Sequence, residues 1–245
     1  MRFRDRVAIV TGAAAGIGHA ATLAFAREGA AVAVVDLKGA DAVADEIGRT
    51  GGHAAGYATD VARAGDVQAM VDGVLARFGR IDVLVNNAGI GRPGRIEALT
   101  EEEWDRTLAV DLKAHFLTCR AVVPIMRRQR SGHIVNVSSI AGRHVSLANS
   151  IAYTSAKAGV IGFTRHLAQE VGRDGIRVNC LAPGATRTPL LADVMDAERE
   201  AAVTARIPLG YVAEPEEQAA IILFLASDDA RYVHGTIVDA NGGLL

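Results

Sequence analysis

The sequence predicts an α/β fold built on a doubly wound parallel sheet, with helices covering both faces of the sheet. Two observations lead to this prediction. Short strands that are almost wholly apolar alternate with helical stretches, as expected when every strand is buried on both sides. No linker, low-complexity segment or internal repeat interrupts the alternation, and half of the residues are hydrophobic. We therefore expect residues 1–245 to form a single domain with a sizeable core.

The expected elements follow one another in a regular order. Each strand is a short apolar run, and most of the helices show apolar residues at helical spacing. The predicted strands are 7–10, 31–35, one ending at 59–60, 81–85, 133–137, 177–181 and 236–239, and the predicted helices are 17–28, 40–50, 64–78, 100–126, 150–171 and one beginning at 214–215.

Local signals mark the helix boundaries in the second half of the chain. Thr100 and Glu103 form a capping box at the start of one long helix. Pro124 is expected to kink the last turns of that helix. Pro215 suits the first turn of the last helix. Residues 185–212 show no clear periodicity, so we expect a loose segment there.

Composition and charge exclude several classes of partner. The 26 basic residues nearly balance the 28 acidic ones, for a formal net charge of −2, and no block of like charges occurs. Nucleic acids and acidic membrane surfaces are therefore not expected partners. Cys119 and Cys180 lie in apolar surroundings far apart in sequence, which indicates core thiols in a reducing cytoplasm. The apolar run at residues 219–226 is too short to span a bilayer, and the seven histidines show no metal-ligand spacing, so no metal is expected.

The glycine-rich stretch at residues 6–18, RVAIVTGAAAGIG, organises the rest of the chain. A predicted strand precedes the loop and a helix follows it. Gly12, Gly16 and Gly18 leave room where the chain turns tightly and where a ligand touches the backbone. The free N–H groups at the start of the following helix suit a pyrophosphate. A structural turn can also be rich in glycine, but the flanking elements and the acidic Asp36 favour a dinucleotide site.

Asp36, at the end of the second strand, predicts the choice of dinucleotide. A carboxylate there accepts hydrogen bonds from both hydroxyls of the adenosine ribose and repels a 2′-phosphate, which favours NAD over NADP. Ala15 and Leu37 are not basic, and Lys38 is the one neighbour that argues for caution. The alternative interpretation is a solvated aspartate that only ends a strand.

Ser139, Tyr153 and Lys157 form a second group of candidate residues. Tyr153 and Lys157 are four residues apart on one predicted helix, so their side chains are neighbours. An adjacent ammonium favours the phenolate form of a tyrosine, which makes its hydroxyl usable as a general acid or base. Ser139 ends the preceding strand and can donate a hydrogen bond to the same substrate oxygen. Alone, Tyr-x-x-x-Lys usually marks a packed ring beside a lysine, so its weight comes from the dinucleotide loop and the serine-tipped strand.

Together these motifs resemble the classical short-chain dehydrogenase/reductase family over essentially the whole chain. The matching residues are Thr11, Gly12, Gly16, Ile17, Gly18, Asp60, Asn86, Asn87, Ala88, Gly89, Ser139, Tyr153, Lys157, Pro183, Gly184, Thr188 and the closing stretch 239–243. The resemblance implies one NAD-binding Rossmann domain with a seven-stranded parallel sheet, usually assembled as a homotetramer. It also implies hydride transfer between a nicotinamide and a small-molecule alcohol or ketone.

The resemblance further implies a role for each matching residue. Tyr153 is the proton donor or acceptor, Ser139 orients the substrate oxygen, and Lys157 also holds the nicotinamide ribose. The expected cofactor contacts are Gly12, Gly16, Ile17, Gly18, Asp36, Asn87, Ala88, Gly89, Tyr153, Lys157, Pro183 and Gly184, with Asp60 and Val61 flanking the adenine and Thr186 and Thr188 meeting the nicotinamide carboxamide.

Asp111 departs from the family pattern, which usually has asparagine at this position. That residue normally supports a water-mediated proton path to Lys157, so the replacement is expected to affect the proton relay or its pH range. One hypothesis is that an ionised Asp111 lies near Lys157. The alternative is that its side chain points away and only its backbone carbonyl matters.

Four further side chains are weaker candidates for substrate contact. His144 and Arg143 lie between Ser139 and the catalytic helix, and Arg92 and Arg95 follow the fourth strand, where they could meet an anionic group. A surface position accounts for His144 and Arg143 equally well, and it is favoured for Arg92 and Arg95 because exposed arginines are common.

We expect a cytoplasmic NAD-dependent dehydrogenase of the polyol, sugar or hydroxy-acid type. Asp36 favours this group over a 3-oxoacyl thioester (acyl-carrier-protein) reductase, because such reductases in the family usually prefer NADPH. A dinucleotide-binding sensor without turnover is a third possibility, against which the intact Ser139, Tyr153 and Lys157 argue. Tyr153 and Lys157 also argue against a methyltransferase, and the histidine spacing argues against a zinc-type alcohol dehydrogenase. The sequence does not indicate the substrate.

Overall fold

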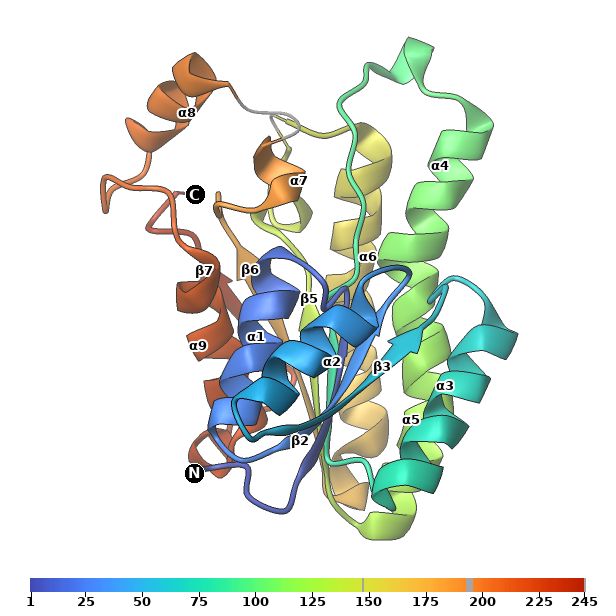
Figure 1. Cartoon of the computed structure of the whole chain (residues 1–245). Helices are drawn as coiled ribbons and strands as arrows, with labels where there is room; N and C mark the ends of the chain where they lie inside the picture. The colour runs from blue at the N-terminus through green and yellow to red at the C-terminus, as the bar shows by residue number, and fades with distance from the viewer. Residues whose placement is uncertain (147, 193–195, 245) are drawn as a thin grey trace.

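One sheet of seven parallel strands forms the centre of the computed structural model, which describes residues 1–146, 148–192 and 196–244 (Figure 1). Within these residues the strand order is β3-β2-β1-β4-β5-β6-β7, which confirms the predicted seven-stranded doubly wound sheet. The strands are β1 (Val7–Thr11), β2 (Ala31–Asp36), β3 (His53–Ala58), β4 (Val83–Asn86), β5 (Gly132–Val137), β6 (Ile176–Pro183) and β7 (Ile237–Ala240).

Helices cover both faces of the sheet, as Figure 1 shows. One face is covered by α1 (Gly16–Arg27), α2 (Ala40–Arg49) and α9 (Pro215–Ala226), and the other by α3 (Ala64–Phe78), α5 (Ala114–Gln129) and α6 (Ile151–Val171). Three shorter helices, α4 (Glu101–Leu108), α7 (Pro189–Ala192) and α8 (Ala197–Thr204), lie beyond the carboxyl ends of the strands.

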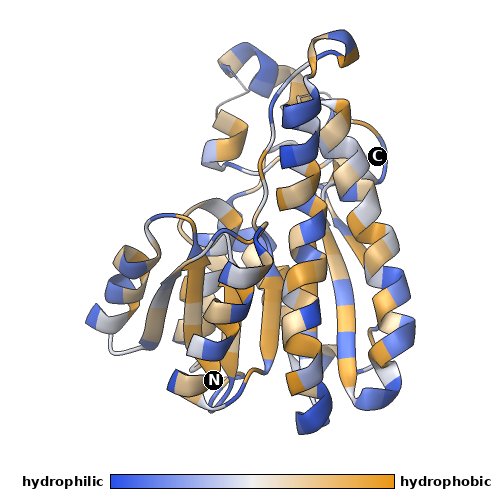
Figure 2. Cartoon of the chain, turned by 90° about the vertical axis from the view of Figure 1, so that its right-hand side faces the viewer, coloured by the Kyte–Doolittle hydropathy of each residue, from blue (hydrophilic) through white to orange (hydrophobic). Residues whose placement is uncertain are grey.

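The side chains of β1 show how one sheet supports two hydrophobic cores. Val7 and Ile9 pack into the core shared with α3 and α5, whereas Ala8 and Val10 pack into the core shared with α1 and α9. All four are buried, and each large side chain contributes about 1.5–3 kcal/mol on leaving water. Because both faces are covered, the strands read as continuous apolar runs. Figure 2 shows these hydrophobic strands between helices that carry hydrophilic residues on their outer sides.

The long helix predicted from Thr100 is divided at a place that the sequence signals did not indicate. The capping box of Thr100 and Glu103 is confirmed, with the Glu103 N–H donating to Thr100 Oγ1 at 3.2 Å. A π-helical turn, η2 (Ala109–Lys113), then separates α4 from α5. The prediction that the helix ends near residue 126 was wrong, since α5 continues through Pro124 to Gln129. Pro124 lies on the exposed side of α5, where water can hydrate the carbonyl that proline leaves unpaired.

The segment 185–212 is more ordered than the sequence indicated. Its described residues include α7 and α8, and the Asp196 carboxylate caps α8 by accepting the Arg199 N–H at 2.9 Å. This N-cap is a sequence signal that the prediction of a loose segment missed; residues 193–195 lie outside the described residues. The start of α9 is as predicted, with Pro215 in the first turn.

The sheet topology places the carboxyl ends of β1 and β4 side by side at the centre. The chain continues from β1 toward β2 and β3 on one side, and from β4 toward β5 and β6 on the other. In such open sheets a ligand binds in the crevice where the strand order reverses. The predicted site residues follow these strand ends.

Candidate active site

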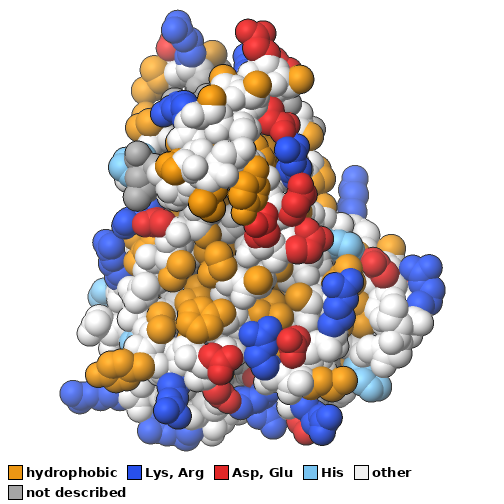
Figure 3. Space-filling model, turned by 90° about the vertical axis from the view of Figure 1, so that its left-hand side faces the viewer, with side chains coloured by type: hydrophobic (Ala, Val, Ile, Leu, Met, Phe, Trp, Pro, Cys, Tyr) orange, Lys and Arg blue, Asp and Glu red, His pale blue; other side chains and the backbone are white. Residues whose placement is uncertain are grey.

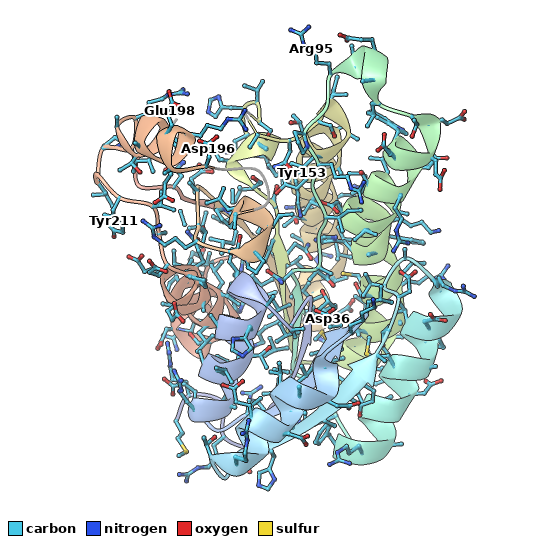
Figure 4. All side chains as sticks on the ribbon, turned by 45° about the horizontal axis from the view of Figure 1, so that its top comes forward. Asp36, Arg95, Tyr153, Asp196, Glu198 and Tyr211 are labelled. Carbon is cyan, nitrogen blue, oxygen red and sulfur yellow. The ribbon has the colours of Figure 1, made fainter. Side chains whose placement is uncertain are left out.

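A cavity of about 560 Å³ opens at the carboxyl ends of the central strands. Its lining includes most of the residues that the sequence singled out, brought together from the ends of β1, β2, β4, β5 and β6 and from α6. These are Gly12, Gly16, Ile17, Asp36, Asn87, Ala88, Gly89, Ser139, Tyr153, Lys157, Pro183, Gly184, Thr186 and Thr188. In Figure 4, Tyr153 and Asp36 are separated along this region, with Tyr153 nearer to α8.

The glycine loop has the geometry of an anion cradle. Gly12 adopts a positive φ of 64°, and a Cβ there would lie 2.8 Å from the Ala88 Cα. Gly18 does not line the cavity; a side chain at this position would collide with the Gly12 carbonyl, so it allows α1 to pack on the loop. No side chain caps the N-terminus of α1, and its first turn holds no acidic residue. These free N–H groups fit the pyrophosphate of a dinucleotide.

Hydrogen bonds fix the glycine loop to the end of β4. Asn87 Nδ2 donates to the carbonyls of Thr11 and Gly12 at 3.0 and 3.1 Å. Thr11 Oγ1 in turn accepts the N–H groups of Asn87 and Ala88 at 3.0 and 3.1 Å. The two central strands therefore present one connected ligand-binding edge.

Asp36 lies at the rim of the cavity beside this loop. Its carboxylate accepts the N–H of Ala14 at 3.0 Å and the N–H of Lys38 at 3.3 Å. These bonds fix the orientation of the carboxylate beside the glycine loop, and its contact with the adenosine ribose stays a prediction. Lys38 itself is exposed and does not line the cavity.

Ser139, Tyr153 and Lys157 line the same cavity. Ser139 Oγ accepts the Ala141 N–H at 3.1 Å, and Lys157 Nζ lies 5.6 Å from the centre of the Tyr153 ring. Lys157 is almost completely buried and donates to the Val137 carbonyl at 3.2 Å. The lysine ammonium is thereby held close to the tyrosine, as the four-residue spacing predicts.

A buried network of hydrogen-bonded polar side chains links the sheet to α5 and α6 next to the site. The sequence analysis did not predict this network. Thr118 Oγ1 donates to Asn86 Oδ1 at 2.7 Å, Asn86 Nδ2 donates to Asn136 Oδ1 at 2.9 Å, and Asn136 Nδ2 donates to Thr164 Oγ1 at 2.9 Å. The four residues come from α5, β4, β5 and α6. Satisfied buried networks of this kind specify one packing arrangement, so the network fixes α6 to the sheet.

Asp111 lies directly behind Lys157. Its carboxylate is fully buried, with Oδ2 at 3.6 Å from Lys157 Nζ and Oδ1 accepting the Ile90 N–H at 2.8 Å. Among the described residues, Oδ2 has no hydrogen-bond partner. Gly89 makes room for the ion pair, because a Cβ there would lie 3.2 Å from Nζ. The hypothesis that the side chain points away from Lys157 is therefore wrong. The π-helical turn η2, which contains Asp111, is a feature often found at functional sites.

Comparisons with known proteins agree with this geometry. A family model described as enoyl-(acyl carrier protein) reductase matches residues 12–245. A 3-oxoacyl-[acyl-carrier-protein] reductase of Thermotoga maritima is 43% identical over 100% of both chains. A D-threitol dehydrogenase of Mycolicibacterium smegmatis is 44% identical over 99% of this chain and 94% of its own. A solved structure assigned as an NAD(P)-dependent gluconate 5-dehydrogenase from Beutenbergia cavernae, with NADP bound at low occupancy, is 39% identical, covers 100% of this chain and 99% of that chain, and has a TM-score of 0.94.

The chain belongs to the classical short-chain dehydrogenase/reductase family. Its relatives in this family are dehydrogenases and reductases, which supports an oxidoreductase that acts on a CH–OH group. The relatives include both reductive and oxidative enzymes, so membership alone leaves the direction and the substrate open.

The charges of Asp111 and Lys157 depend on each other in this family member. Burial raises the pKa of the Asp111 carboxyl, while the Lys157 ammonium and the Ile90 N–H oppose that rise. Burial lowers the pKa of Lys157, but the Asp111 charge opposes it and the net direction is upward. Each group thus favours the charged form of the other, and the two titrate as one set.

We expect the replacement Asp111→Asn to move the acidic limb of the pH profile for alcohol oxidation to lower pH. The amide keeps the shape and removes the negative charge that offsets the Lys157 ammonium. Where Lys157 keeps its proton in the variant, the more positive surroundings favour the phenolate of Tyr153 at lower pH; loss of the Lys157 proton would move the limb in the opposite direction. The measurement is kcat/KM for alcohol oxidation across pH in the unaltered protein and in Asp111→Asn. We expect the variant to retain or exceed the activity of the unaltered protein. Superimposable pH profiles would contradict an electrostatic effect of Asp111 on Tyr153. A shift of the acidic limb to higher pH would show that the predicted direction of the effect is wrong.

Several predicted residues lie outside the cavity lining. The Asp60 carboxylate accepts the Ala62 N–H at 3.0 Å and lies 3.3 Å from Arg106 Nη1, and neither Asp60 nor Val61 lines the cavity. Their contact with the adenine stays a prediction. Of the weaker candidates, His144 lines the cavity.

The three arginines named as candidates do not line the cavity. Arg143 pairs with Asp239 at 2.9 Å, and Arg95 lies 3.7 Å from Glu97 on a loop that projects above Tyr153 in Figure 4. Arg92 is exposed and also lies outside the lining. Across the described part of the chain, no group of side chains could hold a metal ion, and no helix has the length and hydrophobicity to cross a membrane.

Proposed function

We propose that this protein is an NAD-dependent dehydrogenase that interconverts a secondary alcohol and its ketone, with Tyr153 as general acid/base. The observation that carries the proposal is the convergence of Ser139, Tyr153 and Lys157 on the cavity that also holds the glycine loop. Proton transfer at an alcohol oxygen needs one ionisable group and one orienting donor, and these residues supply both.

The chemistry divides between the cofactor and the chain. Bound NAD supplies the nicotinamide that accepts the hydride. The Ser139 hydroxyl donates a hydrogen bond to the substrate oxygen and fixes its direction. Tyr153 takes the hydroxyl proton during oxidation and returns it during reduction. The Lys157 ammonium, paired with Asp111 at 3.6 Å, provides the positive charge beside the phenolate.

Asp36 supports NAD as the preferred dinucleotide. Its carboxylate is held at the rim of the cavity by two backbone N–H groups, where it would accept the ribose hydroxyls and repel a 2′-phosphate. NADP is bound in the Beutenbergia cavernae structure, which describes that protein and not this chain. For this chain we propose that NAD is preferred over NADP.

A substrate panel tests the proposed function. Polyols, sugars and hydroxy acids are offered with NAD and with NADP, and the corresponding ketones with the reduced forms, while nicotinamide absorbance is followed. We expect oxidation of at least one secondary alcohol with NAD. The absence of turnover with every alcohol and ketone would favour a dinucleotide-binding sensor instead.

A 3-oxoacyl thioester reductase is the second candidate, and the 43% identity to such a reductase of Thermotoga maritima favours it. The same panel separates the two functions when a short 3-oxoacyl thioester is added with NADH and NADPH. Efficient reduction of the thioester with NADPH, and no oxidation of free alcohols, would select this candidate.

We also propose that the enzyme acts in the cytoplasm as a homotetramer without nucleic acid or membrane partners. Figure 3 shows hydrophobic side chains on the face that carries α8 and α9, where Leu209, Tyr211 and Phe224 are exposed. Such surfaces favour association with further copies. Light scattering after size-exclusion chromatography measures the oligomeric state directly.

A further inference from the structure

The cavity contains a cation for which the proposed chemistry has no use. Arg206 lines the cavity together with Leu191, Val203 and Leu244. The other charged amine or guanidinium among the described lining residues is Lys157, which is buried and paired with Asp111. Sequence reasoning did not single out Arg206.

The Arg206 guanidinium has no ion-pair or hydrogen-bond partner among the residues that the structure describes. Two acidic residues of the same segment have other partners: Glu200 pairs with Arg187 at 2.6 Å, and Asp196 caps α8. An arginine keeps its charge at physiological pH and presents a planar fork that fits a carboxylate in bidentate fashion. Arg206 is therefore available to an anionic ligand.

The backbone that carries Arg206 is firmly anchored. The Arg206 N–H donates to the Val203 carbonyl at 3.0 Å at the end of α8. The next residue, Ile207, is buried and packs over Gly242, where a Cβ would lie 2.6 Å from Ile207 Cγ2. The Leu209 N–H also donates to the Gly242 carbonyl at 3.1 Å. The Arg206 side chain itself is exposed, so these contacts fix the position of its Cα at the cavity and leave the guanidinium free to turn toward a ligand.

The helix that precedes Arg206 lies on the side of the cavity away from Asp36. Figure 1 shows α8 above the carboxyl ends of the strands, and in Figure 4 the start of α8, marked by Asp196 and Glu198, lies farther from Asp36 than Tyr153 does. Because Arg206 lines the cavity together with Val203 of α8, we place it on the substrate side, away from the expected adenosine site at Asp36. The lining includes the large apolar side chains Ile140, Val145, Leu190, Leu191, Val203 and Leu244. A ligand that contacts these side chains needs an apolar hydrocarbon portion.

We propose that Arg206 binds the carboxylate of a free secondary hydroxy acid, or of the matching oxo acid, whose reacting carbon lies at Tyr153. This inference rests on the proposed function and names the substrate class. An acyl thioester lacks that carboxylate, so Arg206 favours the free acid over the thioester. A phosphate on a carrier group is the competing source of negative charge, and the experiment separates the two.

The test compares straight-chain and cyclic secondary hydroxy acids of graded length, each beside its neutral amide. For at least one acid we expect kcat/KM with NAD to exceed that of its amide by about 10- to 100-fold, the usual effect of a charged hydrogen bond. Arg206→Gln should remove that advantage mainly by raising KM, and leave the amide within about threefold. Arg95→Gln, which removes an equal charge outside the cavity, is the matched control. Arg206→Lys should retain part of the advantage.

A binding measurement accompanies the kinetics. Cyclohexanecarboxylate has no carbinol and should inhibit the enzyme competitively, with an inhibition constant that rises by about tenfold or more in Arg206→Gln. Equal rates for acid and amide, an equal loss on both in Arg206→Gln, or a rise confined to the KM for NAD would each overturn the inference while the proposed function stands. Preference for a phosphate-bearing thioester that depends on Arg206 would overturn it as well. If neither acids nor amides are oxidised while a polyol or sugar of the panel is, the inference is overturned and the proposed function stands. Only the absence of turnover with every alcohol and ketone overturns the proposed function itself.

Discussion

Replacing Tyr153 with phenylalanine is expected to lower kcat for alcohol oxidation by about 10²-fold or more, because it removes the hydroxyl that exchanges the substrate proton. The ring is buried, with 8% of its surface exposed, so phenylalanine preserves the packing around it. The Lys157 ammonium, 5.6 Å from the ring centre, keeps its other partners, the Val137 carbonyl and Asp111. The measurement is steady-state turnover with the best alcohol of the panel.

A control variant and a binding measurement show whether the loss of turnover is specific to the Tyr153 hydroxyl. Tyr211→Phe is the matched control, because the Tyr211 hydroxyl donates to Glu217 at the surface and does not line the cavity. Its activity should be unchanged. NADH binding, followed by nicotinamide fluorescence, should survive in Tyr153→Phe. A Tyr153→Phe variant that keeps most of its turnover would contradict the assignment of the acid/base.

Replacing Asp36 with alanine is expected to raise kcat/KM for NADP by about tenfold or more and to change that for NAD less. Two like charges a few ångströms apart near a protein surface repel each other by about 1–4 kcal/mol, and the substitution removes this repulsion from the 2′-phosphate. The backbone N–H groups of Ala14 and Lys38 lose their acceptor and become available to an anion. The measurement is kcat/KM for both dinucleotides in both proteins.

The unaltered protein provides the first check of this prediction, because it should prefer NAD. Asp72→Ala is a suitable control, since it removes one carboxylate from the exposed side of α3 away from the cavity. It should leave the ratio of the two kcat/KM values unchanged. Equal use of NAD and NADP by the unaltered protein would contradict the role assigned to Asp36.

The alternation of apolar strands with helices, and the glycine loop with its neighbours, could be predicted from the sequence by itself. These features depend on local physics: a strand buried on both faces is apolar throughout, and a tight turn before a helix requires glycine at set positions. The four-residue spacing of Tyr153 and Lys157 on one helix likewise fixes their proximity. For the same reason the capping box at Thr100 and the proline at the start of α9 were predicted correctly.

Only the tertiary structure decided which way Asp111 points and which cation enters the cavity. The orientation of Asp111 depends on the π-helical turn η2 and on contacts with Lys157 and Ile90, residues 46 and 21 positions away. Arg206 lines the cavity, and the next residue, Ile207, packs over the distant Gly242. The pairing of Asn86 with Asn136 depends on the register of β4 and β5. Contacts between residues distant in sequence leave no periodic signal along one chain, which is why these features could not be predicted from it.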